Sequence, residues 1–160
     1  MKKIIPGIVI AFILPLTGTA VEAASKKGSP WYFAIKGGPM NADGQDDSAI
    51  NLGADVGYRN NKYLSTEIEL TRTLIDGDTR SGNDWEVDTL SAFAAFRSNT
   101  PVKFKAKIGL TDIDYGNDDD LELSFGIGVG FWATGGLMEI EYTELDDGLN
   151  FISLGVNYFF

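Results

Sequence analysis

Charged side chains recur at every second position in three segments of the chain. This spacing places them on one face of an extended strand, because successive side chains of a strand point to opposite faces. Carboxylates can move protons and a lysine beside a serine can activate a nucleophile, so catalysis has to be considered. The same groups can also form structural ion pairs. The residues concerned are Glu67 and Glu69, Lys103, Lys105 and Lys107, and Glu139 and Glu141.

Histidine and cysteine are both absent from the chain. Their absence excludes His-dependent triads, most zinc hydrolase sites, disulfides, thiolate metal sites and cysteine nucleophiles. A Ser–Lys pair would need a free lysine, and the lysines between 102 and 110 have carboxylate partners in the arrangement predicted below. We therefore expect no enzymatic activity and no cofactor.

Aspartates gather in and beside the segments that are rich in turn-forming residues. Oxygen ligands of this kind suit Ca²⁺ or Mg²⁺, but the spacing lacks the pattern and the bidentate Glu of a helix–loop–helix calcium site. Asp also favours turns for conformational reasons. We therefore predict a solvated acidic rim and no metal site. The best candidates for cation ligands are Asp112, Asp114, Asp118, Asp119 and Asp120.

The composition fits a single domain of unusual charge. The chain has 160 residues and a formal net charge of −10, and its pI is near 4.3. An acidic chain is poorly suited to bind phosphate backbones, so nucleic acid is not an expected partner. The mean hydropathy of −0.04 resembles that of a soluble protein. It does not exclude a membrane barrel, whose lipid-facing and lumen-facing residues cancel on average.

The first 23 residues have the organisation of a secretory signal peptide. Lys2 and Lys3 precede an apolar run over 4–16, and small residues lead to a predicted cleavage site after Ala23. A transmembrane anchor is disfavoured, because the run is shorter than the ~20 residues that a spanning helix needs. We expect export and one domain over residues 24–160.

The remaining chain alternates apolar and polar residues in eight stretches, with no convincing helical period. This pattern is typical of β-strands with one apolar face. The predicted strands are 31–38, 50–58, 64–73, 85–97, 102–110, 121–132, 137–145 and 151–160.

Connections of two lengths separate these stretches, which predicts an eight-stranded antiparallel up-and-down transmembrane β-barrel with longer loops at one rim. The fold class is all-β. A soluble lipocalin-like barrel, with its apolar face around a small-ligand cavity, has the same periodicity. The short connections are 59–62, 98–101 and 134–136, and the long ones are 40–49, 74–84, 111–120 and 146–150.

Three features favour an apolar face that points outward. Glycines share the polar face with the charges, where they leave room for long side chains. Aromatic residues cluster near strand ends, as in an interfacial girdle. The charges on the polar face balance at six against six, which a sealed interior requires. We predict a lumen network of Lys36, Asp55, Arg59, Glu67, Glu69, Arg97, Lys103, Lys105, Lys107, Glu122, Glu139 and Glu141.

The first and last predicted strands carry a more specific resemblance. Residues 31–38 (WYFAIKGG) and 152–160 (ISLGVNYFF) resemble the terminal strands of small eight-stranded outer-membrane β-barrels, similar to the opacity proteins and the barrel of outer membrane protein A. The resemblance implies location in the cell outer membrane among lipid and lipopolysaccharide. It also implies that the barrel assembly machinery reads Val156, Tyr158 and Phe160 in the last strand.

The resemblance further implies a structural or surface-interaction role, such as envelope integrity, adhesion or recognition by an extracellular partner through acidic loops. We expect salt bridges to plug the lumen, because eight strands leave an interior that side chains can just fill. A narrow porin-like channel is the alternative within this family. Enzymes of similar architecture use a Ser and a His at the rim, and this chain has no His.

Overall fold

The computed structural model describes residues 29–115, 119–133 and 136–160, and ten strands lie within them. None of the described residues forms a helix that is long and apolar enough to cross a membrane. The predicted signal peptide lies outside the described residues. The strands are β1 (Trp31–Ala42), β2 (Ala49–Arg59), β3 (Leu64–Ile75), β4 (Gly77–Asp78), β5 (Asp84–Trp85), β6 (Asp88–Arg97), β7 (Val102–Asp114), β8 (Asp119–Ala133), β9 (Gly136–Asp146) and β10 (Leu149–Phe159).

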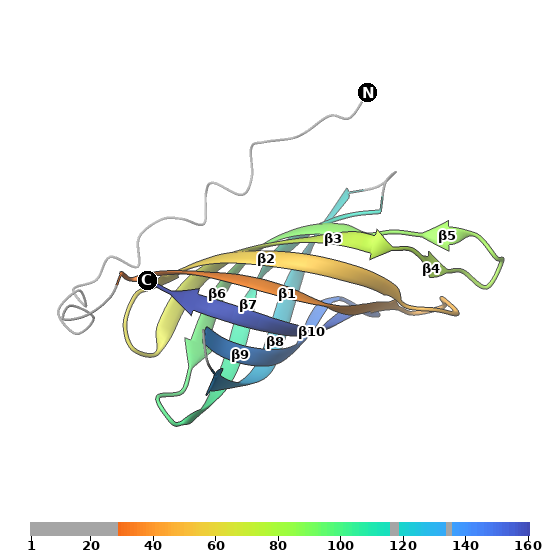
Figure 1. Ribbon diagram of the computed structural model, residues 1–160. Coiled ribbons are helices and arrows are strands. Elements are labelled where there is room, and N and C mark those ends of the chain that lie inside the picture. The colour runs from red at the N-terminus through yellow and green to blue at the C-terminus, as the bar shows by residue number, and fades with distance from the viewer. Residues whose placement is uncertain (1–28, 116–118, 134–135) are drawn as a thin grey trace.

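Eight of these strands form a closed antiparallel barrel (Figure 1), as the sequence predicted. Each pairs with the next long strand of the chain, and β1 closes the barrel on β10 through pairs such as Tyr32 with Phe159. The short strands β4 and β5 form a separate hairpin inside the connection from β3 to β6. Closure leaves no unpaired edge among the barrel strands, so their backbone groups find partners within the sheet.

The two ends of the barrel differ. One end, called the terminal end below, holds the start of β1, the end of β10 and the connections 60–63 and 98–101. The other, called the loop end, holds the connections 43–48, 76–87 and 147–148. Figure 1 shows the C-terminus at the end opposite the β4–β5 hairpin.

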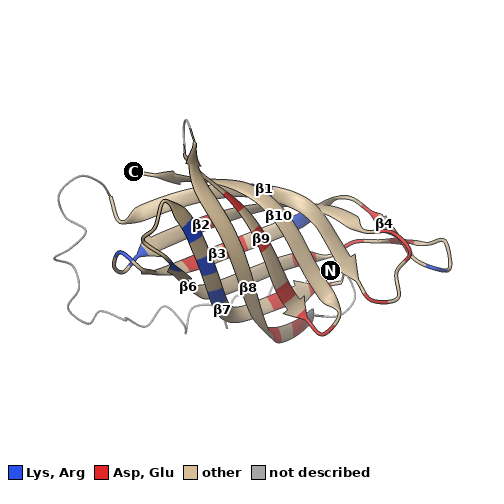
Figure 2. Cartoon of the chain, turned by 90° about the horizontal axis from the view of Figure 1, so that it is seen from below, with Lys and Arg blue, Asp and Glu red and all other residues tan. Residues whose placement is uncertain are grey.

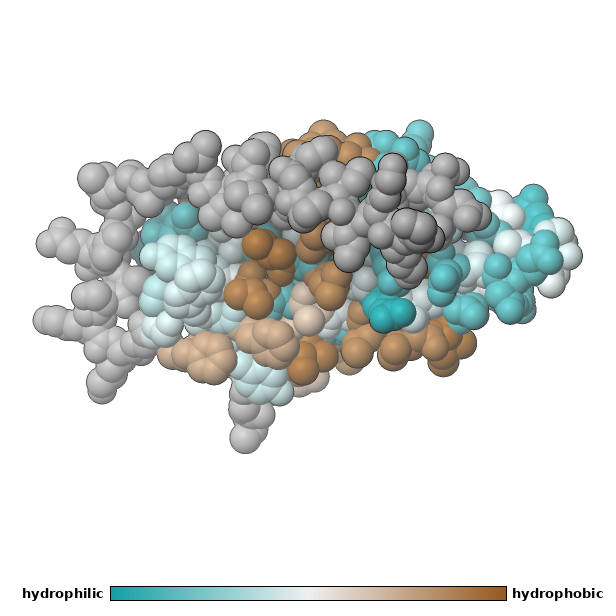
Figure 3. All heavy atoms as spheres, turned by 90° about the horizontal axis from the view of Figure 1, so that it is seen from above, coloured by the Kyte–Doolittle hydropathy of each residue, from teal (hydrophilic) through white to brown (hydrophobic). Residues whose placement is uncertain are grey.

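The apolar face of every barrel strand points outward. In β8, for example, Leu123 and Ile127 are each 63% exposed, whereas Ser124 between them is fully buried. Figure 3 shows hydrophobic side chains over the barrel wall and hydrophilic ones at the loop end. This arrangement is the reverse of a soluble barrel, which buries its apolar face.

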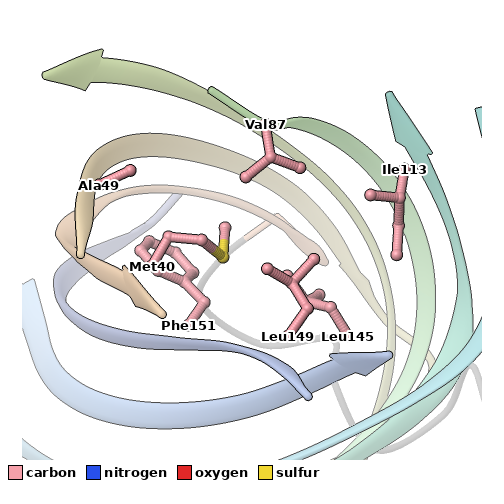
Figure 4. Packing of buried hydrophobic residues seen from close by; sticks show 7 residues of the cluster. All are labelled: Met40, Ala49, Val87, Ile113, Leu145, Leu149 and Phe151. Atoms are coloured by element: carbon pink, nitrogen blue, oxygen red, sulfur yellow. The ribbon is translucent and has the colours of Figure 1, made fainter. Parts of the chain in front are cut away.

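A small apolar cluster closes the interior at the loop end. Its side chains point inward from five barrel strands and from the segment between β5 and β6 (Figure 4). Val87 lies in no strand and reaches into the barrel, where its amide donates to Thr73 Oγ1 at 2.9 Å. The members are Met40, Ala49, Val87, Ile113, Leu145, Leu149 and Phe151.

Several sequence predictions about boundaries were wrong: β1 extends past 38 to Ala42, and β7 extends past 110 to Asp114. The fourth stretch was expected to begin at 85, but Trp85 pairs with Gly77 in the hairpin and β6 begins at Asp88. The connection 146–150 was expected to be long, but β9 and β10 are joined by two residues. Gly148 makes this tight turn with φ of 95°, a region that L side chains rarely adopt.

Two adjacent glycines in β1 provide a test of strand packing. A Cβ on Gly38 would lie 2.1 Å from the carbonyl oxygen of Ile152, whereas a Cβ on Gly37 would meet nothing closer than 3.4 Å. We expect Gly38→Ala to lower the free energy of unfolding by about 1–3 kcal/mol, because β1 and β10 would have to separate. Gly37→Ala is the matched control and should unfold like the parent protein. Urea unfolding of the detergent-solubilised variants measures both, and equal stabilities would contradict this account.

Candidate functional site

Nine charged side chains meet in the middle of the barrel interior. They come from strands whose outward residues are apolar, so alternation places every second, charged residue inside. None of the nine side chains is more than 11% exposed. Figure 2 shows several of these charges on the strands of the barrel. The members of this lumen network are Lys36, Asp55, Glu67, Glu69, Arg97, Lys105, Lys107, Glu139 and Glu141.

Lys105 lies at the centre of the network. Its Nζ is 2.9 Å from Glu67 Oε2, 3.2 Å from Glu139 Oε1 and 2.5 Å from Glu141 Oε2. These carboxylates belong to β3 and β9, which do not pair with each other in the sheet. One ammonium group therefore links two walls of the barrel across its interior.

Lys36 and Lys107 share two carboxylates on the side of the network toward the loop end. Lys36 Nζ lies 2.8 Å from Glu69 Oε2 and 3.0 Å from Glu141 Oε1. Lys107 Nζ lies 2.7 Å and 2.6 Å from the same two oxygens. Lys36 also contacts Asp55 at 3.1 Å. Sharing of this kind neutralises buried carboxylates that would otherwise be costly to remove from water.

Arg97 and Tyr32 complete the network on the side of the terminal end. Arg97 Nη1 lies 2.7 Å from Glu67 Oε1, and Nε lies 3.1 Å from Glu139 Oε2. The hydroxyl of Tyr32 donates to Glu67 and accepts a hydrogen bond from Arg97 at 2.8 Å. The sequence analysis did not assign Tyr32 to the network. Tyr32 and Lys36 are separated by an even number of positions in β1, so both side chains lie on the inner face.

The structure places three predicted network residues elsewhere. Arg59 lies at the terminal end, where it donates to the carbonyl of Ser29 at 2.7 Å and stacks on Phe159. Lys103 also lies there, two residues before Lys105 along β7, and forms no ion pair among the described residues. Glu122 lies toward the loop end, opposite Thr111. All three lie nearer to a mouth of the barrel than the nine residues of the lumen network do.

The charge balance of the network therefore differs from the predicted one. The prediction had six cations and six anions, whereas the network contains four cations and five carboxylates. Asp55 is the least compensated member, with Lys36 as its one ion-pair partner among the described residues. Its Oδ1 is buried without a hydrogen-bond partner there.

A layer of hydroxyl groups, which the sequence reasoning also missed, separates the network from the apolar cluster. Thr111 Oγ1 donates to Ser91 at 2.8 Å, and Ser124 lies 2.7 Å from Thr111. Thr71 and Thr89 form a second pair at 2.7 Å. The interior thus changes from charged to hydroxyl to apolar along the axis, and the buried hydroxyls of this layer find partners in one another.

The structure describes the side chains of three of the five candidate cation ligands. Asp112 and Asp114 are exposed on the last residues of β7. Asp118 and the side chain of Asp119 lie outside the described residues, and Asp120 pairs with Ile113 in the sheet. Among the described residues there is no group of three or more acidic side chains that could hold a metal ion.

The predicted assembly residues line the outer face of β10. Tyr158 is 42% exposed, and Phe160, just past the strand, is 65% exposed. Val156 lies on the same face and is half-buried. The three side chains thus point away from the lumen.

Comparisons with known proteins bear on the architecture. No protein-family model matches the chain, and no curated protein matches it. Among solved structures, Neisserial surface protein A is similar, with a TM-score of 0.57, 18% identity, and coverage of 84% of this chain and 100% of that one. This is the fold of small outer-membrane β-barrels. The N-terminal barrel of Pseudomonas aeruginosa OprF has a TM-score of 0.56 at 13% identity, covering 84% and 100% of the two chains.

Two further solved structures have a similar β-barrel fold. Ail, the attachment invasion locus protein of Yersinia pestis, has a TM-score of 0.52 at 18% identity, covering 84% of this chain and 100% of that one. A de novo designed transmembrane β-barrel reaches 0.59 at 12% identity, with coverage of 84% and 99%. The designed protein shows that the architecture can follow from patterning without common ancestry.

Two lysines of β7 provide a test of the network. We expect Lys105→Met to lower the free energy of unfolding by about 3–5 kcal/mol, because three buried carboxylates lose their shared cation. Lys103→Met makes the same chemical change outside the network and should cost less than about 0.5 kcal/mol. Urea unfolding of the detergent-solubilised protein compares them. Equal losses for the two variants would show that the network does not carry this stability.

Proposed function

We propose that the protein spans the outer membrane as an eight-stranded barrel with a plugged lumen and presents acidic loops to the outside. The observation that carries the proposal is the combination of an apolar outer wall with a charged interior. We assign it no catalytic role. Its role would be structural or interactive, in envelope integrity, adhesion or recognition.

The outer wall supports placement in a bilayer. Large apolar side chains are exposed on every barrel strand. Soluble monomers rarely expose contiguous apolar patches larger than a few hundred Å². A lipocalin-like binder would need an apolar cavity inside, yet the middle of this barrel is filled by ion pairs. One exposed residue from each strand illustrates the belt: Ile35, Leu52, Leu70, Phe96, Ile108, Ile127, Ile140 and Leu154.

Aromatic residues at the terminal end support a boundary with headgroups there. Trp31 and Tyr58 pack edge to face at 5.0 Å between ring centroids, and Tyr63 stacks on Phe96 at 5.9 Å. Amphipathic rings of this kind favour membrane interfaces. In the proposed orientation this end faces the periplasm, and Val156, Tyr158 and Phe160 would be read by the barrel assembly machinery.

The loop end carries the surface for a partner. Ail has been solved in complex with the heparin analogue sucrose octasulfate. The acidic loop end of this chain would repel a sulfated polyanion, so we propose a partner with a basic surface, with lipid and lipopolysaccharide around the wall. The described acidic residues there include Asp43, Asp46, Asp47, Asp76, Asp78, Asp84, Glu86, Asp112, Asp114, Asp120, Glu122, Asp146 and Asp147. The cations Arg72 and Arg80 pair with Asp88 and Asp46.

Packing of the loops supports a defined surface. Trp85 Nε1 donates to the carbonyl of Asp47 at 3.0 Å, which ties the β4–β5 hairpin to the first loop. The backbone amides of Asp46 and Asp47 donate to the carbonyl of Asp78 at 3.0 and 3.2 Å. A preorganised surface loses less entropy when a partner binds.

Membrane placement can be tested by migration on SDS gels. A closed barrel with an apolar outer wall resists SDS until it is boiled, so we expect protein extracted from membranes to migrate differently before and after heating. Recovery of the protein as a detergent-free monomer, with the same migration in both lanes, would contradict membrane placement and favour the lipocalin-like alternative.

A plugged lumen predicts the absence of steady conductance. The network, the hydroxyl layer and the apolar cluster follow one another along the axis, which supports a lumen closed to ions. Protein reconstituted into planar bilayers should therefore show no long-lived open level. The control is a known porin in the same bilayers. Stable ohmic steps from this protein would favour the channel alternative.

A further inference from the structure

A cavity of about 450 Å³ opens at the terminal end of the barrel, away from the loops. Arg59, Lys62, Arg97 and Lys103 line it, together with aromatic side chains that include Trp132 and Phe159. No Asp or Glu is among the described residues that line it. Its volume lies within the range of about 300–1,000 Å³ that is usual for small-molecule sites.

Three of these cations have no anionic partner in the described part of the chain. Arg97 is neutralised by Glu67 and Glu139, but Arg59, Lys62 and Lys103 form no ion pair there. Arg59 Nε is buried without a hydrogen-bond partner among the described residues. On a chain of net charge −10, three cations thus lie at one mouth without an acidic partner among the described residues.

The remaining walls suit an organic group attached to an anion. Trp132 and Phe159 have ring centroids 5.3 Å apart, and the Arg59 guanidinium lies 5.1 Å from the centroid of Phe159. Stacking holds the Arg59 plane at the cavity wall; Nη2 donates to the Ser29 carbonyl at 2.7 Å, which leaves the other N–H groups of the guanidinium for an acceptor. Lys103 adds a compact charge with three donors.

We propose that this mouth binds a phosphate group carried on a small organic moiety of the size of glycerol. Guanidinium forks and ammonium groups are the donors that phosphate oxygens prefer, and aromatic walls accommodate the carbon part. Such a group has two sources: the headgroup of an anionic phospholipid, or a soluble phosphate ester. The site goes beyond the proposed surface role, because it lies at the end of the barrel opposite the acidic loops.

The test uses the purified protein in nanodiscs of phosphatidylcholine, titrated with glycerol 3-phosphate. Binding is followed by NMR shifts of the backbone amides of Asn61, Ser98 and Asn99, which line the cavity. A second arm replaces part of the lipid with phosphatidylglycerol and adds no soluble ligand. The variant is Arg59→Gln with Lys103→Gln, and the matched control, Arg72→Gln with Arg80→Gln, removes the same charge at the loop end.

We expect saturable shifts that weaken about tenfold or more in the Arg59/Lys103 variant and stay unchanged in the Arg72/Arg80 control. A response to glycerol 3-phosphate assigns a soluble ester, and a response to phosphatidylglycerol alone assigns a lipid headgroup. No saturable shift in either arm overturns the proposal. Equal weakening in both variants also overturns it, because the effect would then reflect net charge. Neither variant touches the lumen network, and heat-dependent gel migration checks that each barrel is folded.

Discussion

The structure depends on one constraint, which is that charges inside a closed barrel must neutralise one another. Once the sheet closes with its apolar residues outward, alternation forces the charged residues into a space without bulk water. Lys105 meets this demand with carboxylates from β3 and β9, and Lys36 with carboxylates from β2, β3 and β9. Glycines beside these lysines leave room for their side chains, since a Cβ on Gly126 would lie 2.8 Å from the Lys107 side chain.

Much of this arrangement could be predicted from the sequence, because a period of two is a local property. The alternation from Val102 to Leu110 identified Lys105 and Lys107 as inward, and the eight stretches predicted the strand number. Which carboxylate each lysine meets could not be predicted, because the individual pairs depend on the stagger between strands that are not neighbours. Lys36 on β1 meets Glu141 on β9 with β10 between them.

Alternation also could not predict how far along the barrel axis an inward side chain lies. Lys103 and Lys105 have the same parity on β7, yet one lies at a mouth and the other in the centre. Val87 falls within the stretch predicted over 85–97, but it was not predicted as a core residue, because in the structure it belongs to no strand and reaches the apolar cluster from the segment before β6. The burial of a residue outside regular secondary structure depends on which segments fold around it. A search for periodic patterns does not detect such burial.

The closure of β1 on β10 also constrains the order in which the chain can fold. Lys36 and Glu141 are 105 positions apart in the sequence, and their contact forms when the first and last strands come together. Until that moment the ion pair that joins the two halves of the chain through Lys36 and Glu141 cannot form. The early strand pairs therefore lack part of the network that stabilises the closed barrel. We expect folding to be slow, because such contacts have long sequence separations.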